Sequence, residues 1–342
     1  MTHEENYYRT VEFRNPEYII CSVGMLPATW SKYRGELEDL VIRHPIVFGD
    51  QKKDPNRNFD GFGGTYAEGD HIDNWGCVWK NIRGGMEALV VEHSLDDWSK
   101  FDTFVPPTSG GLPHGFMYMR LYYLRGFENF MIDLMEEPPQ LQKLIDMVLN
   151  YNMNELETIL VNKPKQVGFG DDLGNQTSLP MSPKHWRKYL KPCFAKIFGA
   201  CHDIGAHVYL HSDGHMLEII PDLIECGVTI LNPQIRANTL DGLVEYCKGK
   251  VCVNLDLDRQ MFPFCTPKDI DDQVKEAVMK LGSKEGGLML TAECAPDVPL
   301  ENIEAICQAV EKYRLYYSKR VLKNGLMDAL SQPVEHKIKE EN

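Results

Sequence analysis

The 342-residue chain lacks the features that mark several classes of protein. No uncharged apolar run approaches the roughly 20 residues that cross a bilayer, so a membrane-spanning helix is excluded. The first six residues are polar and acidic, unlike a signal or transit peptide. Acidic residues number 50 against 36 basic ones, and the net charge of −14 argues against nucleic acid and anionic membranes as partners.

The cysteines also lack any pattern. There are ten, scattered singly without a CxxC pair, which favours reduced thiols in a cytoplasm over a disulfide framework. Apolar residues make up 43% and charged residues 25%, the composition of an ordinary globular protein with a sizeable core. We therefore expect a cytoplasmic protein.

From about residue 115 onward, short β-branched or aromatic runs alternate with amphipathic stretches of helical period. Leu141, Leu144, Ile145 and Val148 follow helical spacing. Ser182-Pro183 and Thr266-Pro267 each place a capping hydroxyl before a proline that suits the first helical position. The expected strands are Tyr18–Val23, Ala88–Val91, Phe116–Tyr122, Gln166–Asp171, His207–His211, Val228–Leu231, Val251–Leu255 and Leu288–Thr291.

Roughly eight strands with intervening helices predict an α/β fold, a single (β/α)8 TIM-type barrel over residues 1–330. A doubly wound open sheet is the alternative, but Gly61–Gly69 does not fit GxGxxG and precedes no evident helix. Residues 30–80 are an irregular excursion that we interpret as a lid. Residues 331–342 form a charged tail.

Polar side chains follow five of the expected strands. Since ligands of a parallel barrel bind at the carboxyl ends of the strands, this repetition predicts a functional rim. Each strand end alone has a simpler explanation, because Asp, Asn and Gly favour turns. The polar residues are Asp171, Asp172, Asn175, Gln176, His211, Asp213, His215, Asn232, Gln234, Asn254, Asp256, Glu293 and Cys294.

The sharpest local pattern is His211-x-Asp213, whose side chains point the same way in an extended segment. With Cys294 and Glu293 they offer the usual zinc ligands. Glu293 and Cys294 diverge in a regular strand, so both can bind only if the backbone turns there. A simpler interpretation is that His211 is a hydrogen-bonded histidine of the core and that Cys294 is a small buried residue, with no metal bound to either. Asp171 and Asp172 are either an acid/base pair or a turn with a helix cap.

Several segments, taken in order, resemble the uroporphyrinogen decarboxylase superfamily, specifically its cobamide-dependent methyltransferase branch. They are Gly170–Gln176 with Ser182-Pro183, His211–Gly214, Gly227–Gln234, Thr291–Cys294 and Val298–Asn302. The resemblance implies a (β/α)8 barrel with zinc in its mouth, bound through His-x-Cys and a later Cys. His211 and Cys294 match that pattern, whereas Asp213 stands where the middle cysteine belongs.

Replacing one thiolate by a carboxylate leaves a harder zinc that suits an ether oxygen better than a thiol. The resemblance therefore implies a zinc-dependent methyltransferase that moves a methyl group from a methyl ether, aryl or phenolic, to a corrinoid on a partner protein. This is the first step of O-demethylation. Asp172 and His211 are the expected catalytic residues, and the metal ligands are drawn from His211, Asp213, Glu293 and Cys294.

Substrate contacts are expected from Trp30, Tyr66 and Trp75, which can stack on a flat ring or simply pack the loop onto the barrel. The other expected contacts are Asn175, Gln176, Asn232 and Gln234. The alternatives are a uroporphyrinogen-decarboxylase-like lyase, a zinc hydrolase and a non-catalytic protein that docks a corrinoid carrier. The segment Cys21–Trp30 has no arginine to grip a polycarboxylate, which disfavours the decarboxylase. A homodimer is left open.

Overall fold

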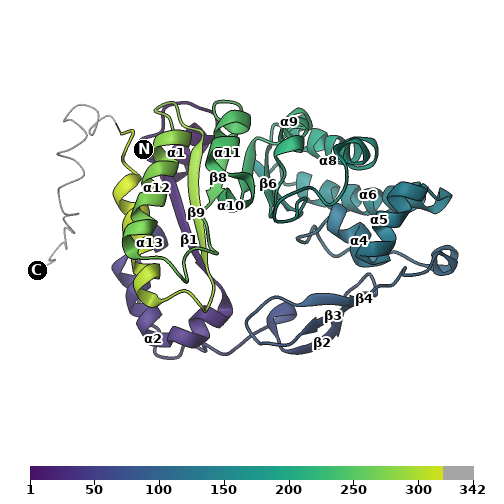
Figure 1. Ribbon diagram of the computed structural model, residues 1–342, viewed down its shortest axis with the longest axis horizontal. Coiled ribbons are helices and arrows are strands. Elements are labelled where there is room, and N and C mark those ends of the chain that lie inside the picture. The colour runs from purple at the N-terminus through teal and green to yellow at the C-terminus, as the bar shows by residue number, and fades with distance from the viewer. Residues whose placement is uncertain (319–342) are drawn as a thin grey trace, which may run out of the picture.

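A computed structural model describes residues 1–318, and its centre is a curled sheet of six parallel strands (Figure 1). The spatial order is β1-β9-β8-β7-β6-β5, so strands consecutive in the second half of the chain are neighbours. The predicted charged tail, residues 331–342, lies outside the described residues. The strands are β1 (Ile20–Met25), β5 (Gln166–Gly170), β6 (His207–Ser212), β7 (Ile230–Pro233), β8 (Cys252–Asp256) and β9 (Leu288–Cys294).

The first and last strands of the described chain are neighbours at one edge of the sheet. Ile20 lies beside Met289 and Met25 beside Cys294, all in parallel register. Side chains inside the curl, including Ile230 and Cys252, form their own buried cluster, while the outer face packs on helices. This layered arrangement is the α/β barrel class that the alternation of strands and helices predicted, so the predicted fold class is confirmed.

Two of the eight expected strands do not join the parallel sheet. The segment expected as a strand over Phe116–Tyr122 is largely helix α4 (Tyr118–Arg125), whose first amide groups bond to a buried carboxylate of Asp171. Its aromatic residues suggested a strand, but this tertiary cap satisfies a helix instead. Ala88–Val91 overlaps β4 (Leu89–Glu92), which belongs to a separate antiparallel sheet with β2 (Gly69–Ile72) and β3 (Val78–Asn81).

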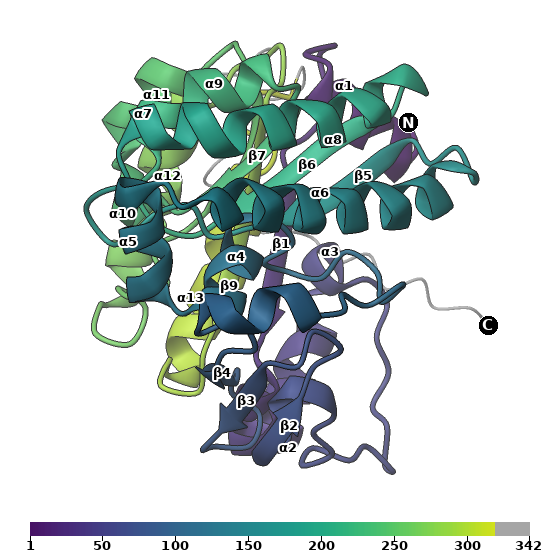
Figure 2. The same cartoon turned by 90° about the vertical axis from the view of Figure 1, so that its right-hand side faces the viewer.

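Helices surround the outer face of the sheet, with α6 and α8 over the β5–β6 side (Figure 2) and α12 and α13 over the β1–β9 side (Figure 1). The predicted caps are confirmed at Ser182 and at Thr266, which forms a capping box with Asp269. The α-helices are α1 (His3–Val11), α2 (Pro27–Arg43), α3 (Pro45–Phe48), α4 (Tyr118–Arg125), α5 (Phe127–Glu136), α6 (Pro139–Leu160), α7 (Pro183–His185), α8 (Lys191–Asp203), α9 (Ile220–Glu225), α10 (Ile235–Asn238), α11 (Leu240–Cys247), α12 (Pro267–Leu281) and α13 (Leu300–Tyr313). Shorter helical turns are η1 (Gly64–Tyr66), η2 (Trp98–Thr103), η3 (Trp186–Leu190) and η4 (Leu217–Ile219).

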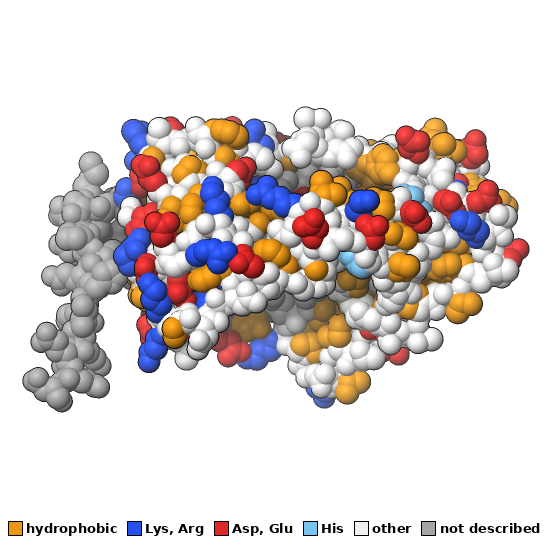
Figure 3. All heavy atoms as spheres, turned by 90° about the horizontal axis from the view of Figure 1, so that it is seen from below, with side chains coloured by type: hydrophobic (Ala, Val, Ile, Leu, Met, Phe, Trp, Pro, Cys, Tyr) orange, Lys and Arg blue, Asp and Glu red, His pale blue; other side chains and the backbone are white. Residues whose placement is uncertain are grey.

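The predicted excursion over residues 30–80 is less irregular than expected. Helix α2 runs from Pro27 through Arg43, with a kink at Arg34, so the start of the segment is helical. The small sheet lies below the parallel sheet in Figure 1, and the loop between β3 and β4 contacts the start of α2, where the Ala28 amide donates to the Gly85 carbonyl. Seen from below, acidic and basic side chains are interspersed over this face (Figure 3). Within residues 1–318, no helix is both long and apolar enough to span a membrane.

His44, directly after α2, forms ion pairs with two glutamates of α13. The imidazole is buried, and its two nitrogens lie 3.0 Å from Glu304 and 3.1 Å from Glu311. Burial lowers the pKa of His44, but hydrogen bonds and charge from Glu311 and Glu304 outweigh it and raise the net pKa. His44 is thereby favoured as an imidazolium in the folded chain.

We expect His44→Gln to lower the free energy of unfolding by roughly 1–3 kcal/mol at about pH 6, since it leaves two partly buried carboxylates short of a charged donor. The raised folded pKa means that this contribution is fully present below the unfolded pKa and is lost as the pH rises through the folded value. Urea unfolding of both proteins at about pH 6 and about pH 9 measures the difference. An equal difference at both pH values would show that His44 acts only through packing.

Candidate active site

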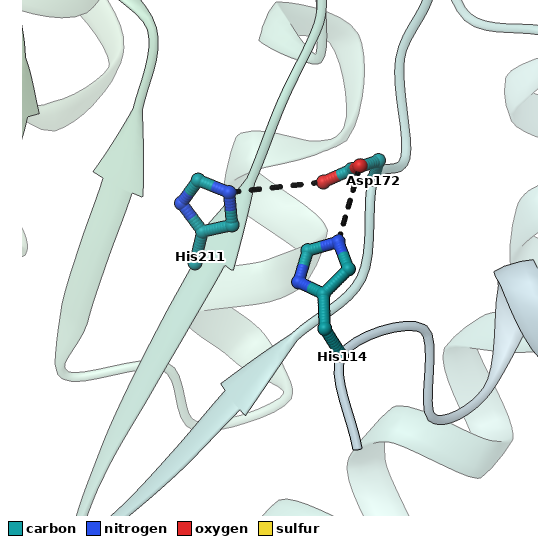
Figure 4. Close-up of side chains that lie close together, drawn as sticks. All are labelled: His114, Asp172 and His211. Atoms are coloured by element: carbon teal, nitrogen blue, oxygen red, sulfur yellow. Dashed lines mark ion pairs between the residues drawn. The ribbon is translucent and has the colours of Figure 1, made fainter. Parts of the chain in front are cut away.

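Two histidines and a carboxylate meet at the carboxyl ends of β5 and β6 (Figure 4). Asp172 follows β5, His211 lies in β6, and His114 comes from the loop before α4. Asp172 lies 3.1 Å from Nε2 of His114 and 3.8 Å from Nε2 of His211. One ligand atom from each of the three residues lies within 4.8 Å of the others. We call this group the rim cluster.

Neighbouring amides fix the orientation of His211. The side chain of Asn232 in β7 donates from Nδ2 to the backbone oxygen of Asn254, which leaves its Oδ1 facing Nδ1 of His211 at 2.7 Å. Nδ1 of His211 is therefore the donor, and Nε2 points toward Asp172 and Asp213. Asn232, predicted to contact substrate, sets the tautomer of His211.

His114 reaches the cluster by lying over Gly170, the last residue of β5. The amide of Gly115 donates to the carbonyl of Gly170 at 2.7 Å, which anchors the loop beside the strand. A Cβ added at Gly170 would overlap Nδ1 of His114. Only glycine leaves room for the imidazole at this position.

Opposite charges stabilise the ionised forms of the rim cluster. Burial lowers the pKa of His211, but Asp213 at 3.3 Å, together with Asn232 and Asp172, raises it to about 9. Burial also lowers the pKa of His114, and the contact with Asp172 more than reverses this effect. For Asp172, burial raises the pKa, but His114 outweighs it and holds the pKa below its usual value. Asp172 is thus a carboxylate at neutral pH.

A second charged group, centred on Arg259, lies beside the rim cluster. The guanidinium of Arg259 pairs with Asp213 and, at 2.7 Å, with Glu293, and its Nη2 lies 3.8 Å from Asp256. Burial raises the pKa of Asp256 to about 7, against the opposing effect of Arg259. Glu293, expected as a metal ligand, is therefore engaged by a cation and is not a member of the rim cluster.

The predicted ligand Cys294 does not reach the rim cluster. Strand β9 stays regular through Cys294, so Glu293 and Cys294 point to opposite sides of the sheet. The Cys294 side chain is fully buried in the hydrophobic core together with Cys307 of α13. Burial, followed by the charge of Glu293, raises the pKa of the Cys294 thiol. The expectation that Cys294 pairs with His211 as a ligand is corrected: the backbone turn that it required is absent from this strand.

Asp171 and Gln234 serve as backbone supports. The fully buried carboxylate of Asp171 accepts from the amides of Tyr118 and Met119 at 2.6 and 2.9 Å and so caps α4. Burial raises the pKa of Asp171 to about 7, against these hydrogen bonds. Gln234, expected to contact substrate, is buried and accepts from the amide of Gly214 at 3.0 Å. It holds the loop that carries Asp213.

The expected aromatic contacts have different surroundings. Trp75 is 2% exposed and packs edge-on against Tyr151 in the core, so its ring is not available to a substrate. Trp30 is half-buried under the guanidinium of Arg57, 3.5 Å from the ring centroid. Tyr66 is half-buried in a short helical turn, and burial, followed by the charges of Glu87 and Glu293, raises its pKa.

Asn175 and Gln176 are exposed on the loop after β5 and are free to contact a ligand at the mouth. His215, which the sequence predicted to be a capping or surface residue, donates from Nδ1 to the carbonyl of Ala237 at 2.8 Å. His215, Asn175 and Gln176 are not members of the rim cluster.

Sequence reasoning missed two residues of this site, His114 and Arg259. Arg259 lies three residues beyond β8, so the strand-end rule that selected Asp256 extends to it. His114 stands in a loop before a segment misread as a strand, where no spacing connects it with Asp172. The adjacent Gly115, which has a positive φ of 73°, is the one local sign of a tight backbone approach.

We expect Gly170→Ala to disable the rim cluster while sparing the fold. The new Cβ overlaps the movable ring of His114, whereas Gly170 itself has no strained φ. Loss of a positioned group by this displacement should lower activity or ligand affinity by about 10–100-fold. Gly168→Ala, two residues earlier in β5 with open space around its Cβ, is the matched control. Equal activity in both variants would contradict the role of His114.

Comparison with known proteins relates this chain to a family. No curated protein matches the chain in sequence. Among solved structures, a methyltransferase from Methanosarcina mazei is similar at a TM-score of 0.60, with 15% identity over 90% of this chain and 98% of that chain. A dihydropteroate synthase from Xanthomonas albilineans matches at a TM-score of 0.29, with 12% identity over 43% of this chain and 52% of that one. At these identities the likeness to the methyltransferase concerns the fold alone.

The family model for uroporphyrinogen decarboxylase (URO-D) matches residues 118–313. This range is more than half of the chain and includes β5 to β9, with Asp172, His211 and Arg259. His114 lies outside it. The chain therefore belongs to the uroporphyrinogen decarboxylase (URO-D) family.

Proposed function

We propose that this protein is a methyltransferase whose active site is the rim cluster. The observation that carries the proposal is the convergence of His114, Asp172 and His211 at the carboxyl ends of the barrel strands. Family membership and the fold shared with a methyltransferase from Methanosarcina mazei support it. We further propose that the methyl donor is a methyl ether, aryl or phenolic, and that the acceptor is a corrinoid held by a partner protein.

The rim cluster suits a divalent metal, which we propose to be zinc. Imidazole nitrogen and carboxylate oxygen are common zinc ligands, and three of them leave a fourth position open. One oxygen of Asp213, Oδ1, is buried beside His211 and accepts no hydrogen bond, as expected of an oxygen that faces a cation. When bound, the metal would act as a Lewis acid toward the ether oxygen.

This donor set has no thiolate, since Cys294 lies in the core. Oxygen and imidazole ligands make a harder centre than the thiolate sets that hold sulfur nucleophiles, and this favours an oxygen-containing methyl donor. The bond that breaks is the one between the methyl carbon and the ether oxygen. Its electron pair stays with the oxygen, and the methyl group passes to the acceptor.

The residues of the site orient the methyl donor and stabilise the negative charge that develops on the leaving ether oxygen. Asn232 holds Nε2 of His211 toward the cluster, and the amide of Asp213 fixes Asp172 through a 3.0 Å hydrogen bond. Nε2 of His211 can hold either a metal or a proton. With a pKa of about 9, a metal-free His211 is an imidazolium that can protonate the leaving oxygen. The metal content of the active protein decides between these two roles.

A decarboxylase of polycarboxylate substrates is less well supported. Such a substrate requires unpaired cations, whereas Arg259 is already surrounded by the carboxylates of Asp213, Glu293 and Asp256. The segment Cys21–Trp30 contributes no arginine. This charge distribution favours an uncharged donor at the mouth.

The test is to incubate the purified protein with a panel of aryl methyl ethers and a reduced corrinoid protein, and to measure the demethylated product and the absorbance of the methylated corrinoid. We expect both products in equal amounts. His202→Ala is the control, because His202 is exposed and bonds Gly227 before β7, at the opposite end of the strands. Demethylation without corrinoid would identify a hydrolase instead. No turnover of any ether would refute the proposed activity.

A further inference from the structure

Arg259 joins three strand ends beside the rim cluster. Its Nη1 lies 2.7 Å from Glu293 of β9, and its Nη2 pairs with Asp213 after β6 and lies 3.8 Å from Asp256 of β8. The side chain is 24% exposed, so these pairs are partly shielded from water. Because a guanidinium is planar and its nitrogens engage different carboxylates, its position fixes theirs.

The two carboxylate oxygens of Asp213 have different surroundings. Oδ2 is held by Arg259, while Oδ1 is buried, accepts no hydrogen bond and lies 3.3 Å from Nε2 of His211. The backbone amide of Asp213 is also fixed, since it donates to Oδ1 of Asp172. Without Arg259, the 3.3 Å contact with His211 would be the one remaining contact in this group that holds the carboxylate in its orientation.

We propose that Arg259 is a positioning residue that aims Oδ1 of Asp213 at Nε2 of His211, so that this carboxylate lends its negative charge to a metal held by His114, Asp172 and His211 while the fourth position stays open. The inference rests on the proposed metal site and assigns a role to a residue that does not itself touch the metal. The planar fork is essential to this role. A lysine would restore one positive charge but could not hold both Asp213 and Glu293 in fixed planes.

Metal affinity tests the proposal separately from activity. Zinc affinity is measured by competition with a chromophoric chelator for the wild type, Arg259→Ala and Arg259→Lys, with urea unfolding to verify folding. We expect Arg259→Ala to bind zinc about 10–100-fold more weakly and Arg259→Lys to recover only a small part of the loss. Added guanidinium ion should restore affinity to Arg259→Ala. Arg187→Ala, which removes a different arginine–carboxylate pair with Asp222, should bind as the wild type does.

The outcomes separate this inference from the proposed function. Wild-type affinity in Arg259→Ala would overturn the positioning role and leave the metal site standing. Full recovery of zinc affinity in Arg259→Lys would show that a positive charge is sufficient, and it would also overturn the positioning role. If Arg259→Ala does not fold, Asp213→Asn, of nearly the same shape, must weaken zinc binding by a similar factor. A wild type that binds no zinc would refute both proposals.

Discussion

Replacing His114 with alanine should abolish the proposed metal binding and lower the proposed methyl transfer by about 100-fold or more. Loss of residues that merely orient metal ligands costs about 10–100-fold in affinity or activity, so loss of a ligand should cost no less. His114 contributes one of three ligand atoms, and Asp172 loses its partner at 3.1 Å. Elemental analysis of the purified variant and the coupled corrinoid assay measure the two effects.

Cys294→Ala separates the structural assignment of ligands from the one based on sequence resemblance. The thiol lies on the core side of β9, so we expect this variant to bind zinc as the wild type does, if the proposed site is correct, and to lose only packing energy. Removing a single buried sulfur should cost roughly 1 kcal/mol in the free energy of unfolding. Loss of zinc in a well-folded Cys294→Ala, with zinc retained in His114→Ala, would reverse the assignment made here.

Gly214→Ala should destabilise the protein by about 3–4 kcal/mol, because it combines a strained φ with a backbone overlap. Gly214 has φ of 83°, and a Cβ there would overlap the carbonyl of Gly174 on the neighbouring loop. The loops after β5 and β6, which carry Asp172 and Asp213, thus touch backbone to backbone. No side-chain rearrangement can relieve this overlap.

Urea unfolding measures this loss, with Gly249→Ala as the matched control. Gly249 also has a positive φ, 71°, but open space around its Cβ, so alanine there should cost only about 1–2 kcal/mol. The difference between the two variants isolates the contact between the loops. Equal losses would mean that the loops separate without cost.

The sequence predicted the strands and helices best where a local pattern controls them. The alternation of apolar runs located all six strands of the parallel sheet to within a few residues, and Ser182 and Thr266 marked helix starts correctly. It failed at Phe116–Tyr122, because aromatic residues favour strands and the carboxylate that caps α4 comes from Asp171, over forty residues away. A cap contributed by another strand leaves no local signal.

In the candidate site, too, local sequence patterns predicted some features, whereas contacts between distant residues decided others. Strand ends are visible in a sequence, so Asp172, His211, Asp213 and Glu293 could all be placed at the rim in advance. Which of them face one another depends on the curl of the sheet and on whether β9 stays regular, and these brought Glu293 to Arg259 and buried Cys294. His114 enters from a loop through a gap that only Gly170 leaves open. Periodicity determined which residues lie at the rim, whereas the choice among them required the tertiary packing of loops with no sequence spacing in common.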